Sequence, residues 1–348
     1  MARPCGSIRR WSGCRRAPCM TGLIVERIGT GASLQDGGRI GWRRFGISSS
    51  GAMDGMSLAV ANILVGNEPG AAAIETVYAG ARFRAEGGPV MVAAAGPGIG
   101  LSVAGRAVMP GYSALAEPGE DIELSPLKGG IYGYLAVAGG FDLQPDMGSL
   151  STHLRSGLGP ALLTAGNRLS VRGGRMTPLT LPVLPAHDRG PIRVIPGPQD
   201  DWFDDEVQAL LYGADWQFDN RSDRMARFLV GPALAARAGS MVSDGTVPGS
   251  IQVTPMGQPV LLMRDGQTTG GYPKIATVIS TDLHRLSQIP VGARFRFVPV
   301  SIEQAQAIAK AFARTVAGLK PVPAGGIDTG RLWNENLISG VWSTPAED

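Results

Sequence analysis

The sequence predicts a mainly β protein with two β-rich halves and a few short helices. Three observations lead to this fold class: many short apolar runs, frequent turn residues between them, and few helical patterns. Glycine occurs 50 times and proline 26 times in 348 residues, while apolar residues make up 44% of the chain. Such a composition combines a large core with many tight turns, which favours β-barrels or β-sandwiches.

The expected strands are short runs rich in β-branched and apolar residues, separated by glycine and proline turns. Helical spacing of apolar residues occurs at 57–65, 204–211 and 301–315, and the last of these opens with a capping box from Ser301 to Gln304. We expect strands at 23–28, 90–95, 101–103, 121–124, 132–138, 169–172, 192–195, 227–230, 251–254, 260–263, 275–279 and 294–298.

The prolines between 178 and 191 interrupt the apolar pattern and indicate a linker. We therefore expect a first β-barrel subdomain at 21–180, a linker at 181–191, and a second β-barrel subdomain with a terminal helix at 192–318. A tail follows at 319–348, and its segment 334–342 could dock on the surface.

Residues 1–20 differ from the rest of the chain. They hold all three cysteines and five arginines but no acid, so the formal net charge of +3 becomes −2 without them. We expect translation to begin at Met20 and this leader to be disordered or non-native. The nearly neutral body gives no indication of nucleic-acid binding. A body without cysteine fits a reducing cytoplasm, and no apolar run approaches 18 residues, so we expect no membrane span.

The segment 265–274 lies between two apolar runs and carries more chemistry than a strand connection needs. Its polar side chains can hydrogen-bond a ligand, and its paired glycines allow positive φ or close backbone approach. A glycine-rich hairpin without chemistry is the alternative. We expect catalytic side chains at Asp265, Gln267, Thr268, Thr269 and Tyr272, and substrate contacts at Gly270 and Gly271.

A second glycine-rich turn carries Asp36 and Arg39, and Asp54 follows it. We expect these three residues to bind substrate. Two structural alternatives stand beside that expectation: Asp54 can cap the helix that begins near Ser57, and Asp36 can pair with Arg39.

Several kinds of catalytic site have no pattern in this sequence. No two histidines are four residues apart, so we expect no helical zinc pair and no metal site. A Gly-x-Ser-x-Gly elbow and a G-x-x-x-x-G-K-[ST] loop are both missing, so neither a hydrolase triad nor that type of ATP site is predicted. None of the four lysines has a Met-Lys-Met context, so we expect no biotin attached to this chain.

Taken in order, several segments resemble the biotin-dependent carboxyltransferase-like family. The resemblance covers about residues 23–300, and an ordered run of motifs is far more specific than any one of them. The motifs are Gln35-Asp36-Gly37-Gly38-Arg39, Gly51-Ala52-Met53-Asp54, the segment 134–140, Met147-Gly148-Ser149, Pro196-Gly197-Pro198, Ser222-x-Arg224-Met225 and the segment 267–273.

The resemblance implies two cyclophilin-like β-barrel subdomains and a role within a larger complex. The expected role is the C subunit of an ATP-dependent 5-oxoprolinase-type complex, which hydrolyses 5-oxoproline to glutamate with a B subunit of related fold and a third, A subunit. ATP is used at the level of the complex, and we expect the isolated chain to be inactive. Arg224 is the expected contact for a substrate carboxylate.

Two other functions in the family remain open. The chain could be the carboxyltransferase component of a urea or amide carboxylase, or a non-catalytic regulator that antagonises a kinase inhibitor. A neighbouring gene for a biotin carboxylase with its carrier domain would favour the former, and genes for a three-subunit set would argue against the latter.

Overall fold

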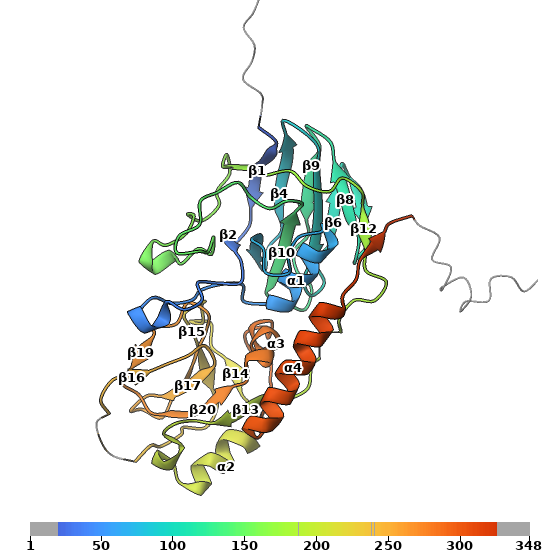
Figure 1. Cartoon of the computed structure of the whole chain (residues 1–348). Coiled ribbons are helices and arrows are strands. Elements are labelled where there is room, and N and C mark those ends of the chain that lie inside the picture. The colour runs from blue at the N-terminus through green and yellow to red at the C-terminus, as the bar shows by residue number, and fades with distance from the viewer. Residues whose placement is uncertain (1–19, 187, 238, 240, 326–348) are drawn as a thin grey trace, which may run out of the picture.

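The computed structural model describes residues 20–325 except 187, 238 and 240 (Figure 1). The expectations for the leader before Met20 and for the tail beyond residue 325, including 334–342, lie outside the described residues. Within the described residues the protein is mainly β with few helices, which confirms the predicted fold class.

Two curled sheets form the first subdomain. Their strands are β1 (Gly22–Ile28), β2 (Ala32–Gln35), β3 (Ala73–Val77), β4 (Ala81–Glu86), β5 (Val90–Ala95), β6 (Leu101–Val103), β7 (Arg106–Val108), β8 (Ser113–Ala116), β9 (Asp121–Leu124), β10 (Tyr132–Val137) and β11 (Arg168–Ser170). One sheet has the order β11-β1-β4-β9-β6-β7 and the other the order β2-β3-β10-β5-β8.

Strand β10 is buried on both faces, and this places it between two hydrophobic clusters. Successive strand residues point to opposite sides of a sheet. Leu135 and Val137 therefore enter the cluster shared by the two sheets, while Tyr134 and Ala136 join a cluster with helix α1 (Gly55–Leu64) and the second subdomain.

The second subdomain is a seven-stranded sheet of order β14-β15-β18-β17-β20-β13-β21. A two-stranded ribbon, two short helices and several turns cover it. Its elements are β13 (Ile192–Pro196), α2 (Asp205–Gly213), β14 (Gln217–Phe218), β15 (Ala226–Val230), β17 (Ser250–Val253), β18 (Pro259–Leu262), β20 (Lys274–Val278), α3 (Leu283–Ser287) and β21 (Phe297–Pro299), with the ribbon formed by β16 (Asp244–Gly245) and β19 (Thr269–Gly270).

The loop between β18 and β20 is not a hairpin turn. Strand β17 pairs with both β18 and β20 and lies between them. Strands β18 and β20 therefore run in the same direction, so the loop passes across β17 from one of its ends to the other. The middle of the loop pairs with Asp244 and Gly245 in the ribbon. The hairpin alternative is wrong for this segment.

The two subdomains are joined over a broad contact. One hydrophobic cluster takes side chains from both, among them Met53 and Tyr134 from the first and Trp216 and Met263 from the second. Helix α4 (Ile302–Gly318) runs along both subdomains (Figure 1). It begins with the predicted capping box from Ser301 to Gln304.

Two further connections hold the ends of the second subdomain. After α4 the chain returns to the first subdomain, where β22 (Val322–Pro323) pairs with β12 (Leu179–Thr180). In the expected linker, the carbonyls of Asp188, Gly190 and Pro191 accept hydrogen bonds from Arg285. The segment is thus fastened to the second subdomain.

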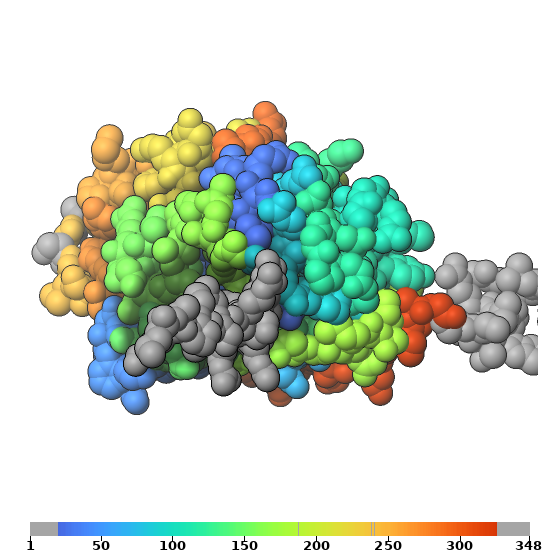
Figure 2. Space-filling model, turned by 90° about the horizontal axis from the view of Figure 1, so that it is seen from above, coloured from blue at the N-terminus to red at the C-terminus, as the bar shows by residue number. Residues whose placement is uncertain are grey.

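Seen from above, the green segment at about residues 145–175 lies next to the yellow and orange surface of the second subdomain (Figure 2). This segment brings His153 and Asp265 together, since the His153 ring bonds the Asp265 carbonyl.

None of the helices in the described part of the chain has the length and apolar character that a bilayer span needs.

Candidate functional site

The loop that follows β18 is held in place by the first subdomain. Arg43 lies in a single helical turn and donates from Nη2 to the carbonyls of Thr246, at 2.7 Å, and Gln267, at 3.1 Å. Thr246 also donates from Oγ1 to the Gln267 carbonyl at 2.5 Å. Because these bonds fix the backbone, the Gln267 side chain extends from a rigid support.

Most side chains of this loop are accessible, although Gln267 Nε2 also donates to Gln252 Oε1 at 3.5 Å. Gln267 and Thr269 are exposed, and Tyr272 keeps 44% of its surface accessible. Amide, hydroxyl and phenol groups in this arrangement can hydrogen-bond a carboxylate or an amide. The structure thus brings Gln267, Thr268, Thr269, Tyr272 and the two glycines together on one accessible loop.

Gln252 on β17 lies directly under the loop and was missed by the sequence reasoning. It is 2% exposed, and its Nε2 has no hydrogen-bond partner. A Cβ built on Gly270 would lie 2.3 Å from that atom, so any larger residue there would require the Gln252 amide to shift. Gly270 does not have positive φ, so of the two properties expected of the paired glycines it provides close approach.

Lys274 closes the loop and is also buried, at 2% exposure. Its Nζ lies 2.7 Å from Asp244 Oδ2. The bond from Lys274 lowers the pKa of Asp244, with further help from the backbone of Gly245 and the side chain of Gln199. The ion pair between Lys274 and Asp244 fastens the end of the loop to the ribbon.

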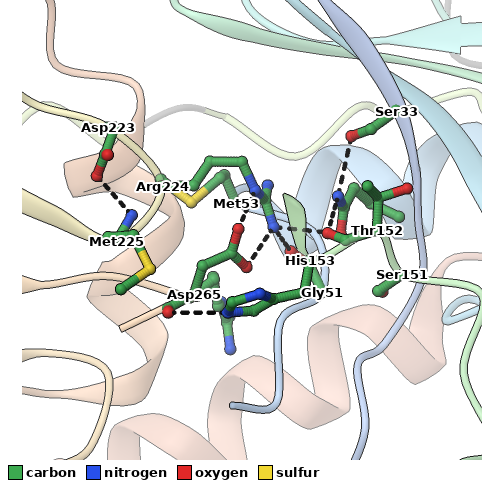
Figure 3. Close-up of polar contacts among 12 residues, drawn as sticks. Ser33, Gly51, Met53, Ser151, Thr152, His153, Asp223, Arg224, Met225 and Asp265 are labelled. Atoms are coloured by element: carbon green, nitrogen blue, oxygen red, sulfur yellow. Dashed lines mark hydrogen bonds and ion pairs between the residues drawn. The ribbon is translucent and has the colours of Figure 1, made fainter. Parts of the chain in front are cut away.

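Arg224 and Asp265 lie in a different environment, at the junction between the subdomains (Figure 3). The guanidinium reaches Glu75 at 2.5 Å and Asp265 at 2.9 Å. It also donates to the Gln35 side chain and the Gly51 carbonyl. Burial lowers the pKa of Arg224, but the two carboxylates outweigh it and hold the pKa well above its ordinary value.

These contacts change the roles expected for both residues. Arg224 was expected to meet a substrate carboxylate, but the carboxylates beside it belong to the protein. Asp265 was expected among the catalytic side chains, but it is 5% exposed and paired with Arg224. We assign both residues to the support of the loop, because a charge saturated by protein groups has little capacity left for a ligand.

Asp54 is also saturated by protein donors. Its Oδ1 accepts from the backbone N–H groups of Met56 and Ser57, which confirms the predicted helix cap. Its Oδ2 accepts from Ser57 Oγ and from Gln288 Nε2 of the second subdomain. With 0% exposure, the residue serves structure, and the expectation of substrate contact is not supported by this geometry.

A hydrogen-bonded chain links this cap to Arg224. The Tyr134 hydroxyl donates to Glu75 Oε2 at 2.6 Å and accepts from the Asp54 N–H at 2.8 Å. Burial, together with the charge of Glu75, raises the pKa of Tyr134 well above its ordinary value, so the phenol keeps its proton. The junction is therefore a connected network of paired groups.

Asp36 and Arg39 do not form the ion pair that their spacing suggested. The Asp36 carboxylate accepts from Ser149 Oγ, Ser151 Oγ and the N–H groups of Gly38 and Leu150. Arg39 is 1% exposed, and none of its three guanidinium nitrogens has a hydrogen-bond partner.

His153 bonds across the junction as a neutral ring. Its Nδ1 accepts from the Ser156 N–H at 3.1 Å, so the proton of the neutral ring lies on Nε2. That Nε2 donates to the Asp265 carbonyl at 3.2 Å. No group of His, Cys, Asp and Glu in the described residues has the arrangement of a metal site.

Sequence comparison decides the family. The family described as "Carboxyltransferase domain, subdomain A and B" matches residues 45–299. The chain belongs to this carboxyltransferase family. It is 38% identical over 290 residues to the C subunit of 5-oxoprolinase from Escherichia coli, an alignment that covers 81% of this chain and 93% of that protein. The resemblance seen in the ordered motifs is thereby confirmed.

Other relatives of this carboxyltransferase family are more distant or longer. The C subunit of 5-oxoprolinase from Haemophilus influenzae is 35% identical over 278 residues, covering 79% of this chain and 90% of that protein. Urea amidolyase of Lachancea kluyveri is 26% identical over 323 residues, covering 83% of this chain but 17% of that protein.

Two solved structures share the fold. A crystal structure of TTHA0988 is 33% identical with a TM-score of 0.73, covering 80% of this chain and 56% of that chain. The Kluyveromyces lactis urea amidolyase is 22% identical with a TM-score of 0.82, covering 88% of this chain and 20% of that chain. The chain thus spans about half of TTHA0988 and a fifth of the amidolyase.

Proposed function

We propose that this chain is the C subunit of an ATP-dependent 5-oxoprolinase-type complex, which hydrolyses 5-oxoproline to glutamate together with the A and B subunits. The observation that carries the proposal is its 38% identity across 93% of the C subunit of Escherichia coli 5-oxoprolinase. Near-complete coverage favours the same role in the same kind of assembly.

The chemistry of the substrate explains why a complex is needed. A lactam carbonyl is a poor electrophile, and coupling to ATP can activate it. In this proposal ATP is used at the level of the complex, which works in the cytoplasm, and no biotin is attached to this chain. The isolated chain is inactive because its partners supply the remaining groups.

The proposed contribution of this chain is the loop through Gln267. The Gln267 amide, the hydroxyls of Thr268 and Thr269, and the Tyr272 phenol hydrogen-bond the substrate. The backbone N–H groups of Gly270 and Gly271 stabilise negative charge that develops on the attacked oxygen. Arg43 from the first subdomain supports this position, since it bonds the Gln267 carbonyl.

The urea carboxylase alternative has weaker support. The urea amidolyase and carboxylase relatives are 25–28% identical, and the alignments cover 17–22% of their length. Any role in carboxyl transfer would therefore depend on domains that this chain does not align with.

The test is reconstitution. The chain is coexpressed with candidate A and B subunits from the same organism, and glutamate formation from 5-oxoproline is measured with and without ATP. We expect ATP-dependent turnover by the complex and none by the purified chain. Turnover by the homogeneous chain alone, or biotin-dependent carboxylation of urea by the complex, would contradict the proposal.

A further inference from the structure

Three arginines in the described residues are less than 9% exposed, and they differ in what they bond. Arg227 donates to the carbonyls of Leu286 and Ile289. Arg285 bonds the Asp282 carboxylate and three linker carbonyls. Arg39 is the most buried of the three, yet its Nε, Nη1 and Nη2 bond nothing in the protein. An unpaired buried guanidinium is costly, so such a group indicates a missing acceptor.

None of the nearby carboxylates bonds the Arg39 guanidinium. Asp36 already accepts four protein hydrogen bonds. Asp146 accepts from the Gly159 N–H, and Asp265 is held by Arg224. Burial lowers the pKa of Arg39, while the charges of Asp36, Asp146 and Asp265 oppose that effect. These charges help the guanidinium to keep its proton without bonding it.

Backbone packs closely against the Arg39 guanidinium without bonding it. Gly159 has a φ of +74°, and a Cβ there would lie 3.0 Å from Arg39 Nη2 and 2.3 Å from the Ser151 carbonyl oxygen. Next to Ser49, whose carbonyl accepts from the Arg39 N–H, Ser50 has a φ of +51°. Its hydroxyl is also buried without a partner. Strained backbone and unpaired polar groups together are typical of ligand sites.

We propose that Arg39 binds the carboxylate of the substrate, with its planar guanidinium donating two parallel hydrogen bonds. The proposal rests on the proposed function, because 5-oxoproline is a small carboxylic acid. Carboxylate geometry matches the arginine fork. Formate or bicarbonate has the same planar oxyanion chemistry, so the experiment must separate these sources from the substrate.

Entry to this site requires the turn at 38–41 to move. Gly38 and Gly41 have φ values of +91° and +92° and flank the turn, and Ile40 at its tip is 79% exposed. This turn carries Arg39 itself, so its opening exposes the guanidinium directly.

The experiment uses the full purified chain in thermal unfolding at constant ionic strength. The probes are 5-oxoproline, formate, bicarbonate and the uncharged lactam 2-pyrrolidinone. We expect 5-oxoproline and formate to raise the melting temperature with increasing concentration, and 2-pyrrolidinone to leave it unchanged. Arg39→Met should abolish the response. Arg39→Lys keeps the charge but lacks the fork, and it should weaken the apparent affinity for 5-oxoproline about tenfold or more.

An equal response of wild type and Arg39→Lys would overturn the proposal, and this variant serves even if Arg39→Met does not fold. No response of the wild type to 5-oxoproline, or a response to formate and bicarbonate alone, would also overturn it. The reconstituted complex gives a separate readout. If the Arg39→Lys complex turns over 5-oxoproline with an unchanged KM, the Arg39 site is contradicted while the proposed hydrolase function stands. Arg39-dependent binding of 5-oxoproline without turnover supports the carboxylate site and contradicts the proposed hydrolysis.

Discussion

Two polar regions meet at Asp265: the buried junction around Arg224, and the accessible loop that continues through Gln267 to Tyr272. In the junction, Arg224 lies between Glu75 and Asp265 and also bonds groups of the first subdomain. In the loop, the backbone is held by Arg43, Thr246 and the ribbon, while most of the polar side chains are exposed. The Gln267 amide makes one long contact, of 3.5 Å, to Gln252 Oε1.

The difference separates structural polar residues from those available to a ligand. A buried charge with a full set of protein partners holds the fold together and is expensive to remove. A polar side chain on a fixed backbone can be removed at little cost to stability and at large cost to binding or catalysis. Arg39 falls between the two, since it is buried like the junction and unpaired like the loop.

The junction should give the largest loss of stability. Arg224→Ala leaves Glu75 and Asp265 as buried charges without their partner, so we expect the free energy of unfolding to fall by about 3–5 kcal/mol. Urea denaturation at pH 7 measures this. Arg237→Ala is the matched control, because both side chains of its pair with Asp204 are exposed and its loss should leave the midpoint unchanged. Similar losses in free energy of unfolding in both variants would show that the buried junction is no more important for stability than an exposed ion pair.

Asp282 is a second buried carboxylate with a full set of protein partners, and the pH dependence of stability tests its role. Asp282 is 0% exposed and accepts hydrogen bonds from Arg193 and Arg285. Burial raises its pKa, but these bonds and charges outweigh it and lower the pKa below the ordinary 3.8. Its stabilising effect is therefore complete above pH 3.8 and is lost as the pH falls below that value.

Asp282→Asn should lower the free energy of unfolding by about 1.5–3 kcal/mol at pH 7. Below pH 3.8 the difference in free energy of unfolding between wild type and variant should become smaller. Urea unfolding at several pH values between 7 and 2.5 measures the free energy of unfolding of both proteins. A gap that stays constant with pH would show that the carboxylate does not titrate as described.

Within the loop, two neighbouring glycines offer a finer test. Gly270→Ala places a Cβ 2.3 Å from Gln252 Nε2, so the buried amide must shift. We expect a loss of about 1–3 kcal/mol, as for overpacking elsewhere. At Gly271 the nearest atoms lie 3.8 Å from the added Cβ, and Gly271→Ala should be tolerated. Equal melting temperatures for the two variants would show that Gln252 does not support the loop.

Local patterns in the sequence predicted much of the fold. Strands such as β5 and β9 and the cap at Asp54 were found from short-range rules. Strand β3 was missed because it contains Glu75, which looks unsuited to a buried strand. Its partner Arg224 lies 149 residues further along the chain, where no local rule can find it.

The site shows the same limit. The segment around Gln267 stays a prediction from its residue types, and the split between Asp265 and the rest of the loop depends on Arg224. The expected strand at 294–298 was partly wrong, since only Phe297–Pro299 pairs with β13. Arg294 and Arg296 instead reach Asp215. Phe295 exchanges backbone hydrogen bonds with Trp216, so the segment is divided between two backbone partners.

The most direct test of the account is Gln267→Ala in the reconstituted complex, with melting temperature and turnover measured on one preparation. Gln258→Ala is the control, because it removes a similar amide from a turn of the same sheet, away from the loop. We predict an unchanged melting temperature for Gln267→Ala and a loss in turnover on the order of 100-fold, as for removal of one oxyanion donor. Full activity with full stability would contradict the claim that the exposed loop is the working site.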